Sequence, residues 1–160
     1  MAKIEFPNES FDLVFSWGVV HHCKDPNKVI DELIGICKPG GTIIMGVYMK
    51  TSLSWFHEFI RKRICLPSPA IFKYPFIQFV AILVHTMRVL GRNIQSRDDF
   101  HRISSQVEDW FFVPIKHFFT IEEMRNKFNG KGIDFELLQE RTSRFKACNV
   151  FVVRGVKKGE

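Results

Sequence analysis

The chain has 160 residues, which suits one compact domain and is too short for two ordinary ones. Its 46% hydrophobic and 25% charged residues exclude disordered and collagen-like classes, and 17 phenylalanines supply enough apolar mass for a core. The net charge of +6 favours an anionic partner without identifying one, and a mildly basic surface accounts for it as well.

The four cysteines indicate free thiols. Cys23, Cys37, Cys65 and Cys148 lie far apart in the sequence, with no Cys-x-x-Cys pair, so we expect a cytoplasmic protein without a disulfide scaffold. The adjacent side chains of residues 21–23 (His-His-Cys) do not converge on one ion, and no second pair stands at ligand spacing. We therefore expect no metal site.

Residues 11–48 predict a strand, a helix and a second strand. The apolar run 11–17 is typical of a strand buried on both faces, and Asp25 before Pro26 predicts a helix start. The Lys-Pro-Gly-Gly sequence at 38–41 ends the helix, and residues 42–48 form the second strand. Two strands joined by an amphipathic helix predict a parallel crossover, part of a doubly wound α/β sheet.

Residues 51–113 predict a helical insertion, with prolines 67, 69 and 75 as breaks. We expect its apolar side chains on one stripe, comprising Phe72, Phe76, Phe79, Val80, Leu83, Met87 and Leu90. The apolar stretch 75–90 is interrupted by three polar residues and is shorter than the ~20 residues that a spanning helix needs. We therefore expect no helix that crosses a bilayer.

The last fifty residues predict a capped helix and a strand pair. Thr120 and Glu123 form a capping box, with Phe119 and Met124 placed as a hydrophobic staple, and the helix ends near residues 129–130. The apolar runs 133–138 and 149–154 suit an antiparallel pair. The Gly-Lys-Gly at 130–132 follows a helix and precedes a strand, so we interpret it as a turn rather than a phosphate-binding loop.

One ordered set of motifs carries a resemblance to a known family. Residues 6–14 (FPNESFDLV) are followed by 18–22 (GVVHH), by Asp25-Pro26 and by 38–41 (KPGG). Together they closely resemble class I S-adenosylmethionine-dependent methyltransferases of the small-molecule type, without a gap from residue 6 to 48. The family's sheet has seven strands in the order 3-2-1-4-5-7-6. The resemblance implies a single partial Rossmann-like domain over residues 1–160, with strands 4 to 7 and an insertion at 51–113 that caps the substrate site.

The resemblance leaves the first three strands without a counterpart. The family's Gly-rich loop and its ribose-binding acidic residue belong to that part, and the printed sequence contains neither. We therefore expect S-adenosylmethionine as cofactor only if the missing half is supplied, and no activity of the chain alone. The first strand would then have an unpaired edge, which fits an excerpt of a longer enzyme, a half supplied by another polypeptide, or pairing with a second copy.

Candidate site residues follow from the end of the first strand. In an open α/β sheet the ligand lies beyond the carboxyl ends of the strands, so Ser16, Trp17, Gly18 and Val19 would form one wall of the cofactor site. Gly18 would allow the backbone to approach the ligand closely. Trp17 would either offer an aromatic face to the adenine or the sulfonium, or pack in the core.

Four further residues are candidates for the reaction face. His21 and His22 would take a proton from the nucleophile or hold the loop, and His21 is the better candidate base. By resemblance His22 matches the commoner family position, which supports the loop. Tyr48 and His117 would line a substrate pocket.

The insertion also contains two basic groups, Arg61-Lys62-Arg63 and the arginines at 88, 92 and 97. It would sit on an anionic membrane, cover a lipid-like substrate, or be a cap with solvated basic edges. No nucleic-acid partner is expected, since the sequence shows no recognition helix. The sequence thus predicts the carboxyl-terminal portion of a methyltransferase acting on a small or lipid-like molecule, or a non-catalytic half that serves as an interaction or dimerisation module.

Overall fold

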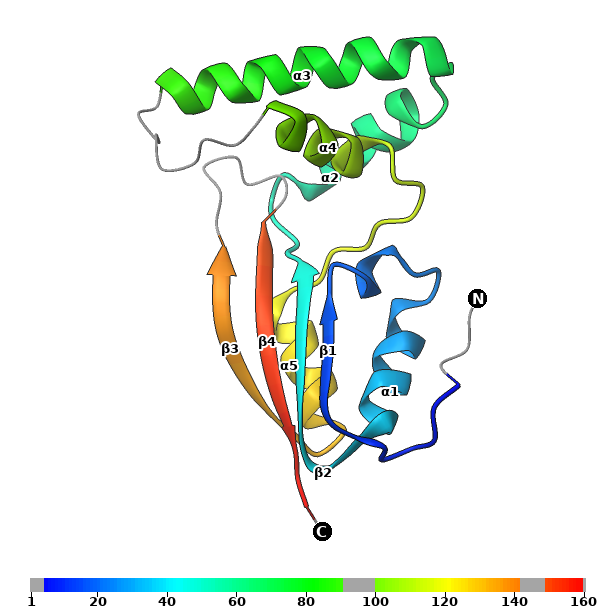
Figure 1. Ribbon diagram of the computed structural model, residues 1–160, viewed down its shortest axis with the longest axis vertical. Coiled ribbons are helices and arrows are strands. Elements are labelled where there is room, and N and C mark those ends of the chain that lie inside the picture. Colours follow the sequence, from blue (N-terminus) through cyan, green and yellow to red (C-terminus); the bar gives the residue numbers. More distant parts are fainter. Residues whose placement is uncertain (1–4, 91–99, 142–148, 160) are drawn as a thin grey trace. The chain divides into compact units, whose positions relative to one another are not determined.

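The computed structural model describes residues 5–90, 100–141 and 149–159 (Figure 1). The chain folds as two compact units, unit 1 with residues 1–54 and 115–160 and unit 2 with residues 55–114. Unit 1 contains a four-stranded sheet and unit 2 is helical. Each unit is described separately below.

The sheet of unit 1 has the order β1-β2-β4-β3. β1 (Phe11–Trp17) pairs parallel to β2 (Cys37–Tyr48), while β4 (Val150–Lys157) pairs antiparallel to both β2 and β3 (Ile133–Arg141). This is the order expected for strands 4-5-7-6 of the seven-stranded sheet. The α/β class, the crossover and the closing antiparallel pair are therefore confirmed.

Two helices cover one face of this sheet. α1 (Pro26–Ile36) begins where Asp25 accepts a hydrogen bond from the backbone N–H of Lys28, and α5 (Ile121–Asn129) begins at the predicted capping box. Ile30 of α1, Phe128 of α5 and Met45 of β2 belong to one buried core cluster, so both helices lie on the same side, as Figure 1 shows. Gly130 ends α5 and Gly132 has φ +71°, which confirms the turn.

The face of β1 that points away from the core beneath α1 and α5 is not covered by other described residues. Leu13, Phe15 and Trp17 are 57%, 62% and 46% exposed, whereas Val14 and Ser16 point into the core and are buried. The expectation that β1 is buried on both faces is therefore wrong. An apolar run alone does not reveal whether a second layer covers the strand.

The prediction that the Lys-Pro-Gly-Gly sequence ends the helix and precedes the second strand is wrong, because α1 ends at Ile36 and residues 38–41 lie inside β2. β2 begins directly after α1 at Cys37, and the pairing advances from Cys37 to Thr42 on β2 while it advances only from Phe11 to Leu13 on β1. Residues 38–41 therefore form a bulge inside β2, with Gly40 at φ +76°. The positive φ explains why glycine stands there.

Unit 2 consists of α2 (Ser54–Ile60, whose first residue belongs to unit 1), the π-helical turn η2 (Arg61–Cys65), α3 (Ala70–Leu90) and α4 (Phe100–Phe111). α3 packs against α4 through a core of Ile77, Ala81, Ile103 and Val107. Pro75 lies inside α3 and does not end the helix, so the predicted break at this proline is wrong.

The predicted apolar stripe of α3 packs only in part, because Val80 borders the α3–α4 core and Phe76 contacts Phe111 of α4. Phe72, Phe79 and Leu83 are exposed, and the buried positions are Ile77 and Ala81. The helix is apolar around most of its circumference, so periodicity could not select the buried side. Among the described residues α3 is also long and apolar enough to cross a membrane by length and composition, which corrects the expectation from the interrupted stretch. A core helix of a soluble protein passes the same test, although only 11% of residues 70–87 are buried.

Candidate functional site

The segment 115–119 brings the predicted reaction-face residues together at the carboxyl ends of β1 and β2. Its backbone is fixed on both sides, because the N–H of His117 donates to the carbonyl of His21 over 2.8 Å and the N–H of Phe119 donates to the carbonyl of Tyr48 over 2.9 Å. Met49 and Phe119 form a further parallel bridge. These contacts hold a cluster of five polar and aromatic side chains, which we call the His–Tyr–Lys cluster: His21, His22, Tyr48, Lys116 and His117.

Tyr48 lies at the centre of this cluster. Its ring centroid is 4.0 Å from that of His21, and the Nζ atom of Lys116 lies 4.1 Å from the same ring. His21, Tyr48 and Lys116 are all less than 9% exposed. Sequence reasoning missed Lys116, because no local pattern distinguishes one lysine in an irregular segment.

His21 and His22 occupy different electrostatic environments. Burial, followed by electrostatic interactions with His22, Lys116 and His117, lowers the pKa of His21 from 6.5 to about 3. His21 is therefore neutral at physiological pH, and its buried Nδ1 has no hydrogen-bond partner among the described residues. The ring of His22 is half-buried, and its Nδ1 lies 2.9 Å from the carbonyl of Ile115. A carbonyl only accepts, so Nδ1 of His22 carries the hydrogen and Nε2 is the basic atom of the neutral ring.

The residues predicted to form the cofactor wall lie at and just after the end of β1. Gly18 has φ +73°, and a Cβ atom at this position would meet nothing within 4 Å, so open space lies beside its backbone. Trp17 is 46% exposed and lies over Gly46, where a Cβ would come within 2.8 Å of the indole. The alternative that Trp17 packs in the core is therefore wrong. Val19 is exposed and Ser16 is buried beneath the strand.

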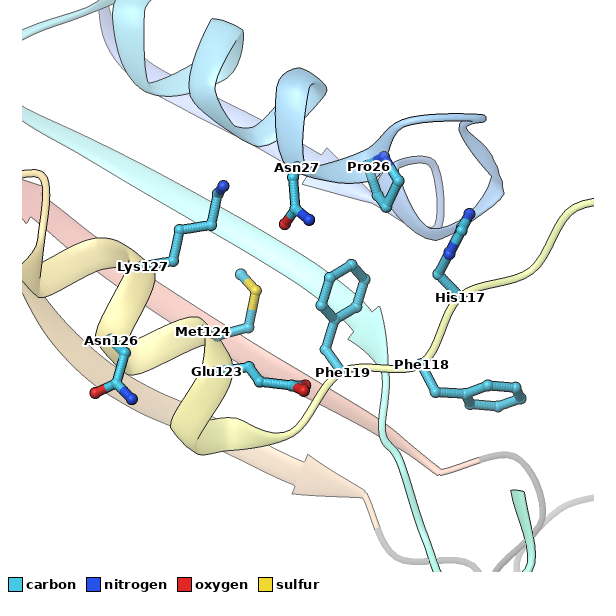
Figure 2. A pocket seen from close by; sticks show the side chains of 9 residues that line it. All are labelled: Pro26, Asn27, His117, Phe118, Phe119, Glu123, Met124, Asn126 and Lys127. Carbon is cyan, nitrogen blue, oxygen red and sulfur yellow. The ribbon is translucent and has the colours of Figure 1, made fainter. Parts of the chain in front are cut away.

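A separate open pocket of about 720 Å³ lies between the N-terminus of α1 and the start of α5 (Figure 2). Of the predicted site residues only His117 lines it, while Asn27, Phe119 and Lys127 line it from the two helices and the segment before α5. Tyr48 and the β1 wall are not among its lining residues. His117 thus belongs to the edge of both the cluster and this pocket.

The sequence matches to known proteins include the end of β1 and the two histidines of the cluster. Residues 1–45 match the family model described as "Methyltransferase domain". An uncharacterized methyltransferase of Mycobacterium tuberculosis is 37% identical over 49 residues, which cover 31% of this chain and 25% of the relative. This part of the chain is therefore similar to methyltransferases.

Parts of two solved structures are similar in fold to the chain. A SAM-dependent methyltransferase from Thermotoga maritima, described as a possible histamine N-methyltransferase, has a TM-score of 0.54 at 17% identity and is matched over 98% of this chain and 60% of its own. The YcgJ protein of Bacillus subtilis has a TM-score of 0.55 at 12% identity, over 99% of this chain and 68% of its own. By sequence, the chain matches only a quarter of the length of the Mycobacterium tuberculosis methyltransferase.

Proposed function

We propose that this chain contributes the acceptor side of an S-adenosylmethionine-dependent methyltransferase that acts on a small or lipid-like molecule. One observation carries the proposal. At the carboxyl ends of β1 and β2, the open space beside the Gly18 backbone occurs together with the His–Tyr–Lys cluster. Ligands of open α/β sheets bind at this edge. The match to the methyltransferase family model over residues 1–45 includes the β1 wall and both histidines.

The residues of the β1 wall fit one side of the cofactor. Gly18 leaves the backbone accessible, and the exposed indole of Trp17 presents an aromatic face that suits an adenine ring or a sulfonium. When bound, S-adenosylmethionine supplies an electrophilic methyl group on sulfur. The protein's own task is to hold the acceptor in line with that methyl group and to exclude water.

The His–Tyr–Lys cluster then provides a side chain that removes a proton from the methyl acceptor. His22 is the better proton acceptor, because its Nδ1–H is fixed by Ile115 and its Nε2 carries the lone pair. The pKa of about 3 makes His21 a weak base at neutral pH, so we assign it a positioning role against Tyr48. Tyr48 and His117 would contact the acceptor.

The missing cofactor contacts would come from a further segment along the edge of β1. This strand is at the end of the sheet order, and its outer face exposes Leu13, Phe15 and Trp17. An exposed apolar strand edge is a template for pairing with another strand. We propose that a methyltransferase segment, on the same or another polypeptide, covers this surface and completes the cofactor site.

A nuclear magnetic resonance titration of the purified chain with S-adenosylhomocysteine tests the proposal. The expected result is weak, millimolar binding that shifts the Trp17 indole and Gly18 amide signals, with the exposed Trp55 of unit 2 as an internal control. Micromolar affinity would contradict the need for a further segment. No shift at Trp17 or Gly18 would contradict the cofactor wall.

The exposed row on β1 also favours a second candidate function, an interaction or dimerisation module without catalysis. It predicts that the chain self-associates in sedimentation experiments and that Phe15→Lys abolishes this association, with no response to S-adenosylhomocysteine. Leu138→Lys, at an exposed position of β3, is the matched control. A monomer at all concentrations would exclude dimerisation through β1.

A further inference from the structure

The outer face of α3 is a large apolar surface on unit 2. We give this name to the exposed side chains on the side of the helix away from Ile77 and Ala81, namely Ile71, Phe72, Phe79, Ile82 and Leu83. Ile71 and Phe79 are 77% and 68% exposed, and the opposite side of the helix packs on α4 through Ile77 and Ala81. Soluble monomers rarely expose so much contiguous apolar surface, which indicates a binding partner.

The chain segment that contains this face is rich in basic residues, of which Lys73 pairs with Glu108 of α4. Residues 54–90 contain five basic residues and a single acidic one, Glu58. Glu58 is already engaged, since its carboxylate binds Arg61 at 2.7 Å and Lys62 at 3.0 Å. Lys62 and Arg63 are exposed at the turn that precedes α3. The side chain of Arg88 and all of Arg92 and Arg97 lie outside the described residues.

An anionic lipid surface fits this combination better than a second copy of the chain. Two copies meeting through the outer face would bring basic segments together, and like charges in an interface oppose association. A lipid surface with acidic head groups attracts the same charges, while the aromatic rings of Phe72 and Phe79 enter the head-group region.

The packing of α3 favours a position in the plane of the membrane over a crossing. α3 is held to α4 by a buried apolar core and by the ion pair between Lys73 and Glu108, whose charged atoms are 2.6 Å apart. The exposed side of α4 contains His101, Arg102 and Ser105, which a bilayer core would not accommodate. The α3–α4 pair therefore has one apolar face and one polar face.

We propose that unit 2 docks on an anionic membrane surface through the outer face of α3, with Lys62 and Arg63 contacting acidic lipid head groups. This inference does not depend on the proposed methyl transfer. It predicts where the chain is bound in a cell, and it favours an acceptor that resides in or at the membrane.

Co-sedimentation of the full chain with vesicles tests the proposal. Vesicles of phosphatidylcholine with phosphatidylserine should bind the chain at least tenfold more tightly than vesicles of phosphatidylcholine alone, and added salt should weaken the binding. Phe72→Ser with Phe79→Ser should reduce the affinity tenfold or more. Both side chains are exposed, so circular dichroism should show an unchanged fold.

A charge pair of variants tests the basic contribution. Lys62→Gln with Arg63→Gln should weaken binding by about fivefold for each charge. Lys24→Gln with Lys28→Gln removes the same charge from exposed positions of unit 1 and should leave the affinity within twofold. Leu138→Ser is the matched apolar control on β3.

Several results would overturn the docking proposal. One is the absence of binding to either vesicle, and another is equal loss of binding in the Lys24/Lys28 control. Retention of the chain on vesicles after a sodium carbonate wash would indicate insertion instead of surface docking. Self-association that Phe72→Ser with Phe79→Ser removes, without vesicle binding, would assign the outer face to a second copy.

Discussion

The Nζ atom of Lys116 lies 4.1 Å from the centroid of the Tyr48 ring, in a site where both residues are buried. A cation over an aromatic face is worth about 0.5–2 kcal/mol, with the larger values at desolvated sites. The same charge opposes protonation of His21. This contact thus links the stability of unit 1 to the protonation state of its candidate site.

Replacing Lys116 should change both properties. We expect Lys116→Met to reduce the free energy of unfolding by about 1–2 kcal/mol and to raise the pKa of His21, because a positive charge beside the ring is removed. Urea unfolding and a magnetic resonance titration of the histidine signals measure the two effects. Lys73→Met, at a half-exposed lysine 5.5 Å from the Phe112 ring centroid, should cost less. An unchanged His21 pKa would contradict the electrostatic link.

The lowered pKa of His21 should make unfolding depend on pH. The unfolded chain binds a proton at this residue below its ordinary value of 6.5, whereas the folded chain does so only near 3. The unfolded state therefore gains protons first, and stability falls as pH falls from 6.5 towards 3, by at most about 1.4 kcal/mol per pH unit from this group.

Urea unfolding at pH 7.5 and pH 5 tests this dependence. His21→Phe keeps a ring against Tyr48 and removes the titrating group, so its stability should change less between the two pH values. The difference from the native chain should be roughly 2 kcal/mol. Equal pH dependence of the two proteins would contradict a buried neutral His21.

Arg61 is a buried charged residue that connects several parts of unit 2 by hydrogen bonds. Its guanidinium binds both carboxylate oxygens of Glu58 and donates to the carbonyls of Val113 and Pro114, and the residue is only 1% exposed. We expect Arg61→Met to reduce the free energy of unfolding by about 3–5 kcal/mol, because two carbonyls lose their donor and Glu58 keeps only the ion pair with the exposed Lys62.

Two variants separate this network from ordinary surface charge. Arg61→Lys should not restore stability, since an ammonium cannot reproduce the two parallel hydrogen bonds to Glu58. Lys62→Met, at a side chain that is 64% exposed, should cost at most about 1 kcal/mol. Thermal unfolding measures all three variants, and equal effects of Arg61→Met and Lys62→Met would contradict the prediction.

The effect of a substitution at Gly46 on the free energy of unfolding should depend strongly on the side chain at position 17. A Cβ at position 46 would lie 2.8 Å from the indole, so Gly46→Ala should cost about 1–3 kcal/mol. In a Trp17→Ala background the same substitution should cost less than about 0.5 kcal/mol. Gly159→Ala, which meets nothing within 4 Å, is the control. Additive effects in the double variant would show that the indole does not cover Gly46.

The sequence by itself determined the local elements of unit 1. The bounds of β1, the start of α1 at Asp25-Pro26 and the capping box of α5 were predicted because each depends on neighbouring residues: an apolar run, a capping carboxylate, a Thr–Glu pair. The strand order followed from the family resemblance and is confirmed. The prediction that Gly18 leaves its backbone accessible agrees with the open space beside this residue, whereas its contact with a cofactor stays a prediction.

Only the tertiary structure decided which faces are covered and which residues meet. His22 and Ile115 are 93 positions apart, and no spacing rule could place Lys116 on Tyr48. The open face of β1 and the packing side of α3 were also undetermined, because an apolar residue carries no information about which neighbour will cover it. Burial depends on contacts between distant segments, and those contacts set the pKa of His21 and expose the outer face of α3.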